Sequence, residues 1–452
     1  MKRRYFGTDG VRGPYGGPVM NEAFAWRLGA AAARFVRSRP DFRSEEILIG
    51  RDTRESGPAL EHALAAGLES GGLQPISLGI VPTPVVSLLT RTEGAALGVV
   101  ITASHNPAGD NGIKFFGPAG IKLTDEEEFS VEQLLPDDGE ANVRAPGTGL
   151  AIAPFRDSLA RYLDLTTALL PAGSLGGWKI VLDTANGAAC ASSRTVLQRL
   201  GASLTLIGNA PDGRNINAGV GSEHVEKMGS AVRDTRARLG IAHDGDADRC
   251  VLCDEDGLVL DGDEILTILA LHALDQGRLA KNTLVITVQS NLGVDAAVTA
   301  AGGRVCRAAV GDRYVVERMR AEGAMLGGES SGHIICAEIS PTGDGLVAAL
   351  KVIQVMLATG KPLSVLRQRL AKFPQISTAV VVREKKPLES LPDLSAALES
   401  VEAELGTGGR VLVRYSGTEP KLRLLVEGPS VAVVQRAMDR LVAATRVDLE
   451  VM

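Results

Sequence analysis

The chain has 452 residues, 45% of them hydrophobic and 23% charged, the composition of a folded protein with about three or four domains. A formal net charge of −6 and an aromatic content of only 4% argue against a nucleic-acid partner, and no apolar run approaches the length needed to cross a membrane. Five cysteines lie mostly in apolar segments, and no signal-peptide pattern precedes them. We therefore expect reduced thiols and a cytoplasmic location.

One arrangement of elements occurs three times along the chain. From residues 47, 179 and 284 onward, an apolar strand leads through a polar turn into a helix, and glycine separates that helix from a second strand. Such units form right-handed crossovers between parallel strands, so we expect three related α/β domains. The last segment has the order strand, helix, strand, strand, helix, which predicts a small α+β domain of TBP-like type.

Stretches that are polar or rich in proline and glycine divide these units. They occur around residues 136–149, at residues 254–257 and at Phe373-Pro374, and such compositions are typical of links between domains. The domain bounds that they predict are 1–150, 151–255, 256–372 and 373–452.

The first candidate site follows a predicted strand of the first domain. The apolar run Leu97–Ile101 predicts a buried strand, and Thr102-Ala-Ser-His-Asn-Pro107 follows it directly. Because open parallel sheets carry their active sites at the carboxyl ends of strands, Ser104 is a candidate nucleophile with His105 beside it. An ordinary turn is the alternative, since Ser and Asn before Pro also favour turns. Farther on, the acidic run Asp125–Glu128 predicts only a solvent-exposed helix start.

The second candidate site follows an apolar run of the second domain. Asp244, Asp246 and Asp248 alternate with small residues, which is not the spacing of a helix face. Three carboxylates in a tight loop repel one another unless a hard divalent cation neutralises them. An EF-hand would require glycine at its sixth position, where this chain has Arg249, and predicted strands rather than helices flank the loop. We therefore expect Mg²⁺ at the end of a strand.

Four motifs follow one another along the chain: Ser104-His-Asn-Pro107, Asp244-Gly-Asp-Ala-Asp-Arg249, Gly328-Glu-Ser-Ser-Gly-His333 and Arg414-Tyr-Ser-Gly-Thr-Glu-Pro420. Together they resemble the motifs of the α-D-phosphohexomutase superfamily, and the resemblance covers essentially the whole chain. The opening Arg4-Tyr-Phe-Gly-Thr-Asp-Gly-Val-Arg-Gly13 and the form of the last motif are most similar to members that act on amino sugars. The resemblance implies four domains around a central active-site cleft.

The implied activity is that of an isomerase. A phosphoserine and a 1,6-bisphosphate intermediate would move a phosphoryl group between the two ends of a hexosamine phosphate. The implied ligands of one Mg²⁺ are a phosphate oxygen on Ser104 and the carboxylates of Asp244, Asp246 and Asp248. The implied acid–base group consists of Arg12, Lys114 and His333. His105 is either a rival base or a brace for the serine loop.

Further residues are candidates for binding the sugar phosphate. Arg249 can hold phosphoryl oxygens while it balances the carboxylates, and a surface ion pair is its alternative role. Glu329 and Ser331 suit two sugar hydroxyls, as the family uses them, with helix capping or a turn as the alternative. Arg313, in a family-like loop, is expected near the substrate. The residues that the resemblance implies for binding the phosphate that is not transferred are Arg414, Ser416, Gly417, Thr418 and Arg423.

Other functions fit parts of this pattern. A phosphoglucomutase or phosphomannomutase of the same superfamily would keep every site residue, because no carboxylate is assigned to a 2-amino group. A sugar-phosphate-binding protein without turnover would not need Ser104 and the aspartates intact, and a phosphatase would need water at the phosphoserine. The expected partners are a small amino-sugar phosphate and a hexosamine 1,6-bisphosphate primer, with a homodimer as one option for assembly.

Overall fold

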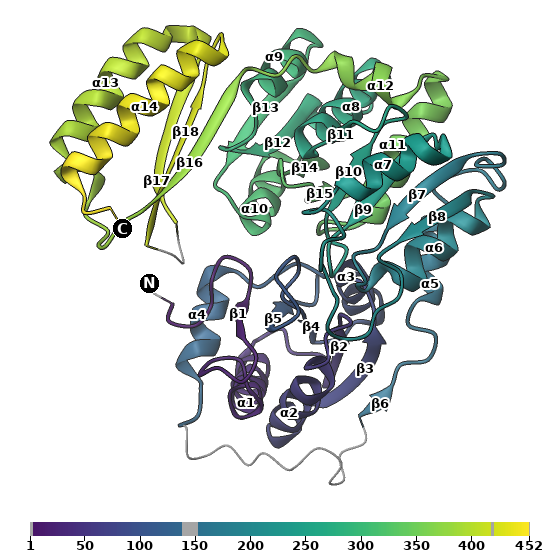
Figure 1. The fold of residues 1–452 in the computed structure, drawn as a ribbon. Helices are drawn as coiled ribbons and strands as arrows, with labels where there is room; N and C mark the ends of the chain where they lie inside the picture. The colour runs from purple at the N-terminus through teal and green to yellow at the C-terminus, as the bar shows by residue number, and fades with distance from the viewer. Residues whose placement is uncertain (1–2, 138–151, 417–419, 452) are drawn as a thin grey trace.

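The computed structural model describes residues 3–137, 152–416 and 420–451. These residues form four units that follow one another along the chain, each built on its own β-sheet (Figure 1). The first three units combine parallel strands with helices, and the fourth has an antiparallel sheet covered by helices. Three α/β domains followed by an α+β domain is the fold class that the sequence predicts, and the structure confirms it.

The first unit contains a six-stranded sheet in the order β1-β5-β4-β2-β3-β6. Its strands are β1 (Val11–Pro14), β2 (Glu46–Arg51), β3 (Gln74–Ile80), β4 (Leu97–Ile101), β5 (Asp110–Phe116) and β6 (Ala153–Pro154). Its helices are α1 (Glu22–Ser38), α2 (Gly57–Ser70), α3 (Thr83–Glu93) and α4 (Asp125–Gln133). Helices α1 and α2 approach so closely that a Cβ on Gly67 would lie 2.0 Å from the carbonyl oxygen of Trp26. Only glycine permits this contact.

The second unit contains a five-stranded sheet in the order β11-β10-β9-β7-β8. Its strands are β7 (Lys179–Asp183), β8 (Ser203–Ile207), β9 (Leu239–His243), β10 (Cys250–Cys253) and β11 (Val259–Leu260). Its helices are α5 (Ala160–Thr167), α6 (Ala189–Arg199) and α7 (Glu226–Thr235). Strands β7, β8 and β9 run parallel, as the predicted crossovers require.

The third unit contains a four-stranded sheet in the order β13-β12-β14-β15. Its strands are β12 (Thr283–Thr287), β13 (Arg304–Ala308), β14 (Leu326–Gly328) and β15 (Ile334–Cys336). Its helices are α8 (Gly262–Asp275), η2 (Ala280–Asn282), α9 (Leu292–Ala300), α10 (Asp312–Glu322), α11 (Gly345–Thr359), α12 (Leu363–Leu366) and η3 (Arg367–Arg369). One apolar core runs continuously from the first unit through the second into the third. These three units therefore pack as one body.

The first three units share one feature of topology. In each of them a parallel strand turns back into an antiparallel neighbour that follows it directly in the chain, in the pairs β4–β5, β9–β10 and β14–β15. The three connecting loops contain Ser104, the aspartate cluster and the motif from residue 328 to residue 333. The same strand end of each unit therefore carries one of the sequence motifs, and these ends face the middle of the molecule (Figure 1).

The fourth unit has an antiparallel sheet in the order β16-β18-β17. Its elements are β16 (Gln375–Val381), η4 (Leu388–Ser390), α13 (Pro392–Leu405), η5 (Gly406–Gly408), β17 (Arg410–Tyr415), β18 (Lys421–Glu427) and α14 (Val431–Asp448). Its described apolar core consists of its own residues. Polar contacts join it to the third unit: the N–H of Leu292 donates to Glu427 Oε1 (3.1 Å), and Arg410 Nη2 donates to the carbonyl of Ser290 (2.6 Å).

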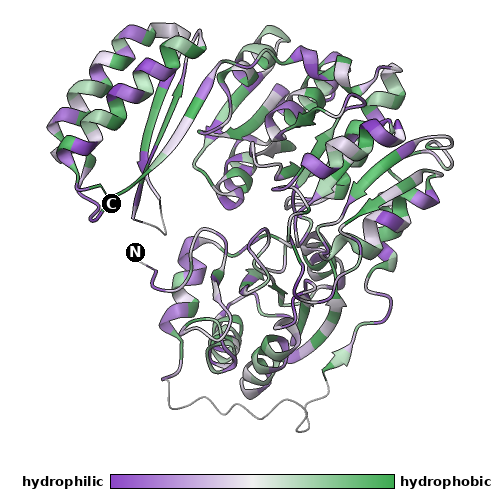
Figure 2. Cartoon of the chain, viewed as in Figure 1, coloured by the Kyte–Doolittle hydropathy of each residue, from purple (hydrophilic) through white to green (hydrophobic). Residues whose placement is uncertain are grey.

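Hydrophobic residues follow this layered arrangement. Figure 2 shows them concentrated in the sheets, whereas α13 and α14 alternate between hydrophobic and hydrophilic residues, as expected for helices with one buried face. In the described part of the chain, no single helix has both the length and the apolar character to cross a membrane. One bent pair, Gly345–Thr359 with Leu363–Arg369, meets the criteria of length and composition only.

One predicted surface feature is buried instead. Helix α4 starts where the acidic run predicts, with a capping box at its first turn, but Glu128 is only 1% exposed. Arg313 of the third unit donates to Glu128 (2.9 Å), and Arg3 pairs with the same carboxylate. The prediction of a solvent-exposed run is therefore wrong at Glu128. Arg313, expected near the substrate, instead pairs with Asp125 and Glu128, because a buried guanidinium needs a carboxylate partner.

The substitution Glu128→Gln should lower the free energy of unfolding by about 3 kcal/mol, because it leaves Arg3 and Arg313 with only the partly exposed carboxylate of Asp125 as a charged partner. Unfolding in urea measures the change. Glu126→Gln, at an exposed position of the same helix, is the matched control and should change stability by less than about 0.5 kcal/mol. Equal effects of the two substitutions would contradict a structural role for the buried pair.

Candidate active site

Ser104 lies in the loop between β4 and β5 and is 1% exposed. Its backbone has φ = +52°, in the left-handed region that residues other than glycine rarely adopt. Its N–H donates to Thr102 Oγ1 (2.9 Å), and its Oγ donates to Asp244 Oδ2 (2.6 Å). The Oγ also lies 3.3 Å from His105 Nδ1. The structure thus joins the candidate nucleophile to the aspartate loop, although the two are far apart in the sequence.

The three aspartates form a compact cluster in the loop between β9 and β10. One oxygen atom from each lies within 4.8 Å of the others, and none of the three residues is more than 2% exposed. Asp246 Oδ2 accepts hydrogen bonds from Thr83 Oγ1 (2.7 Å) and Lys114 Nζ (3.0 Å). Among the described residues, Oδ1 of Asp246 and Oδ1 of Asp248 have no hydrogen-bond donor. Buried, unpaired oxygen atoms that converge in this way fit a hard divalent cation such as Mg²⁺.

Burial and mutual repulsion shift the protonation of this cluster. Burial, followed by the charges of Asp248 and Asp246, raises the pKa of Asp244 well above its usual value. Burial also acts to raise the pKa of Asp246, but the Lys114 ammonium and the Thr83 hydroxyl hold that pKa below its ordinary range. A bound divalent cation would supply the positive charge that all three ionised carboxylates require.

Lys114 and Arg12 lie on the neighbouring strands β5 and β1. Lys114 Nζ is 3.0 Å from Asp246 Oδ2 and 3.0 Å from Asp9 Oδ2. Burial acts to lower the pKa of Lys114, but the charges of Asp246 and Asp9 raise it above its usual value, so this side chain is a permanent cation. Arg12 forms an ion pair with Asp9 and donates to the carbonyl of Ala103 (3.4 Å). Both predicted residues therefore border the serine and aspartate loops.

His105 and Arg249 lie next to the Ser104–Asp244 contact, His105 beside Ser104 Oγ and Arg249 beside Asp244 Oδ2. Burial, followed by the charge of Arg249, lowers the pKa of His105 to about 3, so the imidazole is neutral at physiological pH. Arg249 Nε is 3.9 Å from Asp244 Oδ2, and its Nη1 is 3.7 Å from Glu223 Oε1. Within the described residues this Nε has no hydrogen-bond acceptor. The guanidinium therefore borders the cluster with a donor that an anionic group can use.

His333 lies in the loop between β14 and β15 and is 3% exposed. Its Nδ1 is 3.9 Å from Asp248 Oδ1, and its Nε2 is 3.5 Å from Asp312 Oδ2. Lys122 Nζ forms ion pairs with two aspartates, 2.6 Å from Asp312 Oδ2 and 2.5 Å from Asp9 Oδ1. Sequence reasoning gave no role to Lys122, Asp312 or Asp9. The only signal was the place of both aspartates beside glycine in polar loops, Thr8-Asp9-Gly10 and Gly311-Asp312.

Glu329 and Ser331 belong to the same loop as His333. Glu329 Oε1 accepts from the N–H of Gly311 (2.9 Å), and its Oε2 accepts from Ser331 Oγ (3.4 Å). In the fourth unit, Arg414 and Arg423 lie directly opposite each other on β17 and β18. Burial, followed by the charge of Arg423, lowers the pKa of Arg414, and Glu329 opposes this shift. Two adjacent arginines on neighbouring strands are suited to a phosphate dianion.

The loop after β17 is described in part. Ser416 is 4% exposed, its N–H donates to the carbonyl of Lys421 (2.8 Å), and its own carbonyl accepts from Lys385 Nζ (2.6 Å). Gly417 and Thr418, also predicted to bind phosphate, lie outside the described residues. A pocket extends along this sheet toward the third unit, and its polar lining residues are Gln289, Ser377, Thr378, Arg414 and Arg423.

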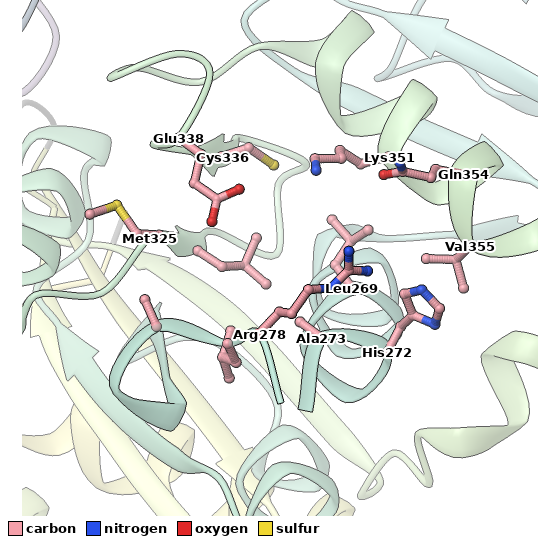
Figure 3. Close-up of a pocket in the computed structure, with 13 residues that line it drawn as sticks. Leu269, His272, Ala273, Arg278, Met325, Cys336, Glu338, Lys351, Gln354 and Val355 are labelled. Carbon is pink, nitrogen blue, oxygen red and sulfur yellow. The ribbon is translucent and has the colours of Figure 1, made fainter. Parts of the chain in front are cut away.

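A separate pocket lies between α8 and α11 of the third unit (Figure 3). Its lining combines apolar and charged side chains, among them Leu269, Leu326, Val355, Arg278, Lys351 and Glu338. Among the described residues that line it, none is a residue that the sequence predicts for the site. The candidate active site is therefore defined by the converging loops and not by this pocket.

Comparison with known proteins covers nearly the whole chain. Family models match four consecutive segments, described as phosphoglucomutase/phosphomannomutase alpha/beta/alpha domains I, II and III and the C-terminal domain, at residues 3–142, 160–257, 261–373 and 378–444. The phosphoglucosamine mutase of Caulobacter vibrioides is 44% identical over 98% of this chain and 99% of the relative. That of Moorella thermoacetica is 47% identical over 94% of this chain and 95% of the relative.

Solved structures share the fold at lower identity. A phosphoglucomutase/phosphomannomutase family protein from Burkholderia thailandensis superimposes with a TM-score of 0.79 at 22% identity, over 98% of each chain. The N-acetylphosphoglucosamine mutase of Aspergillus fumigatus, solved with GlcNAc-6P and magnesium, gives a TM-score of 0.65 at 18% identity, over 99% of this chain and 96% of that chain.

The substitution Asp244→Asn should weaken Mg²⁺ binding by about tenfold or more, because it removes one ionised oxygen from the cluster. The metal-free protein should lose little stability, because relief of repulsion among the buried carboxylates offsets the loss of one of the two hydrogen bonds that Asp244 accepts, from Ser104 Oγ and from the Arg249 N–H. Titration calorimetry and thermal melting measure the two effects.

The matched control for this substitution is Asp256→Asn, at an exposed position in the turn after β10. It should leave both the Mg²⁺ affinity and the melting temperature unchanged. Unchanged Mg²⁺ affinity in Asp244→Asn would overturn the assignment of the cluster as a metal site.

Proposed function

The chain belongs to the phosphoglucomutase/phosphomannomutase family, and on that premise we propose that it interconverts glucosamine 6-phosphate and glucosamine 1-phosphate. It is an isomerase that transfers phosphoryl groups. The observation that carries the proposal is the 2.6 Å contact between Ser104 Oγ and Asp244 Oδ2, which sets a buried hydroxyl against a cluster that fits a divalent cation. The amino sugar follows from phosphoglucosamine mutases that share 44% and 47% identity with nearly the full chain. The 1-phosphate product leads toward UDP-N-acetylglucosamine.

Ser104 carries the phosphoryl group that is transferred. In the first step the P–O bond to Ser104 Oγ breaks and a P–O bond to the free substrate hydroxyl forms, which gives a 1,6-bisphosphate. The hydroxyl proton passes to a base, and Ser104 Oγ gains a proton. The bisphosphate then turns end over end, and the reverse transfer from its other phosphate restores the phosphoserine. The number of phosphates does not change, so the net reaction is an isomerisation.

Asp244, Asp246 and Asp248 would hold one Mg²⁺ together with a phosphate oxygen on Ser104. When bound, the cation withdraws charge from the phosphoryl oxygens. Lys114 provides a fixed positive charge on the other side of the cluster. Charges that are already in place need no reorganisation during the reaction, so they lower its barrier.

The acid–base roles follow from the surroundings of each candidate. We assign the substrate proton to His333, because its ring lies at the edge of the cluster, with Nδ1 3.9 Å from Asp248 Oδ1 and Nε2 3.5 Å from Asp312 Oδ2. Lys114 stays protonated and donates hydrogen bonds, and Arg12 supports the rim of the serine loop. His105, with its pKa lowered to about 3, is suited to bracing Ser104.

The remaining residues bind the two ends of the substrate. Arg249 holds the phosphoryl group in transit, and Glu329 with Ser331 accepts sugar hydroxyls. The site that binds the phosphate that stays in place consists of Arg414, Ser416, Gly417, Thr418 and Arg423. We further propose that the protein acts in the cytoplasm on small sugar phosphates and that it can assemble as a homodimer.

The purified protein, given Mg²⁺ and a trace of hexose 1,6-bisphosphate, should convert glucosamine 6-phosphate faster than glucose 6-phosphate or mannose 6-phosphate. Separate reactions with each sugar, in which the 1-phosphate is quantified, measure this preference. Ser104→Ala should lower all three rates by at least about 10³-fold, because it removes the atom that carries the phosphoryl group.

Other results of these reactions would indicate other functions. Preference for glucose or mannose would move the protein to the phosphoglucomutase or phosphomannomutase reaction. Release of inorganic phosphate at the rate of isomerisation would indicate a phosphatase. No isomerisation by a protein phosphorylated on Ser104 would indicate a sugar-phosphate-binding protein.

The substitution Arg414→Ala should raise KM for the sugar phosphate by about 10-fold or more and change kcat less, because a charge-assisted phosphate contact contributes about 1.5–3 kcal/mol. Steady-state kinetics of isomerisation measures both constants. Arg383→Ala, which removes an exposed arginine of the same unit paired with Glu450, is the control and should leave both constants unchanged. A fall in kcat alone would contradict a role in ground-state phosphate binding.

A further inference from the structure

Arg54 is a buried arginine that none of the motifs explains. It follows β2 in a polar turn, and its side chain is 0% exposed. A guanidinium carries five N–H groups, and here each has an acceptor. These acceptors are Asp52 Oδ2 (2.9 Å) and the carbonyl oxygens of Ser104 (3.1 Å), Asn106 (2.8 Å), Pro107 and Asp110 (2.8 Å).

Four of these five acceptors are backbone carbonyl oxygens between residues 104 and 110, in the loop that carries Ser104 and at the first residue of β5. Adjacent parallel strands explain the placement, because β2 pairs with β4 in a register that sets Arg51 beside Ile101. The residues after Arg51 must therefore lie beside the residues after Ile101. Arg54 reaches the serine loop from the neighbouring strand end of the same sheet.

A second side chain, from the second unit, holds the same loop. Asn217, in the second unit, donates through Nδ2 to the carbonyls of Ser104 (2.8 Å) and Asn106 (3.0 Å). Its own backbone is left-handed, with φ = +58°, and its N–H donates to the carbonyl of Ala185 (2.9 Å). Arg54 and Asn217 thus bind the same two carbonyl oxygens from different units.

The N–H side of Ser104 is fixed by the same assembly. Ser104 N–H donates to Thr102 Oγ1 (2.9 Å), and that hydroxyl donates to Asp52 Oδ2 (2.6 Å), the oxygen that also accepts from Arg54 Nε. Asp52 is 0% exposed. The peptide groups on both sides of the Ser104 Cα are therefore held by one buried network.

This network coincides with a backbone conformation that is unfavourable by itself. Ser104 has φ = +52°, and an L-residue other than glycine stays in that region only when surrounding contacts impose it. In this conformation Ser104 Oγ points to Asp244 Oδ2 at 2.6 Å. A relaxed backbone would aim the hydroxyl elsewhere without removing any residue that touches the substrate.

We propose that Arg54 and Asn217 are positioning residues that hold the Ser104 backbone in its left-handed conformation and so aim the phosphoryl-carrying hydroxyl at the metal-binding cluster. The proposal rests on the proposed function of Ser104. Arg54 acts on four carbonyl groups of the loop, and Asn217 couples that loop to the unit that carries the aspartates. All five N–H groups of Arg54 and both side-chain N–H groups of Asn217 donate to these acceptors, so neither side chain can also donate a hydrogen bond to the substrate.

The test compares rates of Ser104 phosphorylation. Arg54→Lys keeps a positive charge beside Asp52, but a single ammonium nitrogen cannot reach the acceptors that a planar guanidinium spans. Each protein is incubated with Mg²⁺ and glucose 1,6-bisphosphate, and mass spectrometry follows the phosphate on Ser104. We expect the rate of phosphorylation and kcat to fall by about 100-fold, while KM for the sugar phosphate and the affinity for Mg²⁺ stay within about twofold.

Arg367→Lys is the matched control, because it makes the same chemical change at another arginine with three different acceptor groups, although Arg367 is 21% exposed and Arg54 is fully buried. Arg367 donates to Asp254, to Glu264 and to the carbonyl of Val259, away from the serine loop. This variant should lose thermal stability without losing phosphorylation rate. The control therefore separates a loss of packing from a loss of positioning.

Asn217→Gly is the second test, since glycine accepts the left-handed backbone while the side-chain amide is lost. It should slow Ser104 phosphorylation by about tenfold with KM unchanged, and it decides the matter if Arg54→Lys does not fold. Phosphorylation at the unsubstituted rate in a folded Arg54→Lys protein or in Asn217→Gly would overturn the proposal. If the unsubstituted protein neither accepts phosphate on Ser104 nor isomerises sugar phosphates, the proposed function itself fails.

Discussion

The feature on which the rest of this structure depends is a group of buried carboxylates that must stay close together. Asp244, Asp246 and Asp248 are almost fully removed from water, where ionised groups of like charge are strongly unfavourable. The surrounding elements supply compensation from several directions. Lys114 contacts Asp246 from β5, and the Ser104 hydroxyl contacts Asp244 from the serine loop. The arrangement that offsets repulsion among the three aspartates is also suited to binding a divalent cation and a phosphoryl group.

These contacts can offset the repulsion between the aspartates only if separate parts of the chain keep fixed positions relative to one another. The first three units share one continuous apolar core, so the loops after β4, β9 and β14 are fixed relative to one another. A short contact such as the one between Thr83 and Asp246 (2.7 Å) depends on this rigidity. Lys122, between Asp9 and Asp312, extends the alternation of charges across the boundary between the first and third units.

Over the residues that the structure describes, the fourth unit is attached to the third by polar contacts rather than by a shared apolar core. Its apolar core is its own, and hydrogen bonds from Leu292 to Glu427 and from Arg410 to Ser290 join it to the third unit. Arg414 and Arg423 lie on its sheet, whereas the acidic cluster lies in the second unit. The architecture thus separates a rigid centre of chemistry from a phosphate-binding unit held by polar contacts.

The sequence by itself determined the order of elements, the fold class, the candidate nucleophile Ser104 and the three aspartates, because strand periodicity and charge repulsion are local properties. Only the tertiary structure decided what depends on neighbours from other segments. Glu128 reads as solvent-exposed in the sequence, yet Arg313 buries it. Arg54 stands in an ordinary polar turn, and its contacts with the serine loop are visible only once β2 and β4 lie side by side, because hydrogen-bond partners and burial are set by contacts between distant segments.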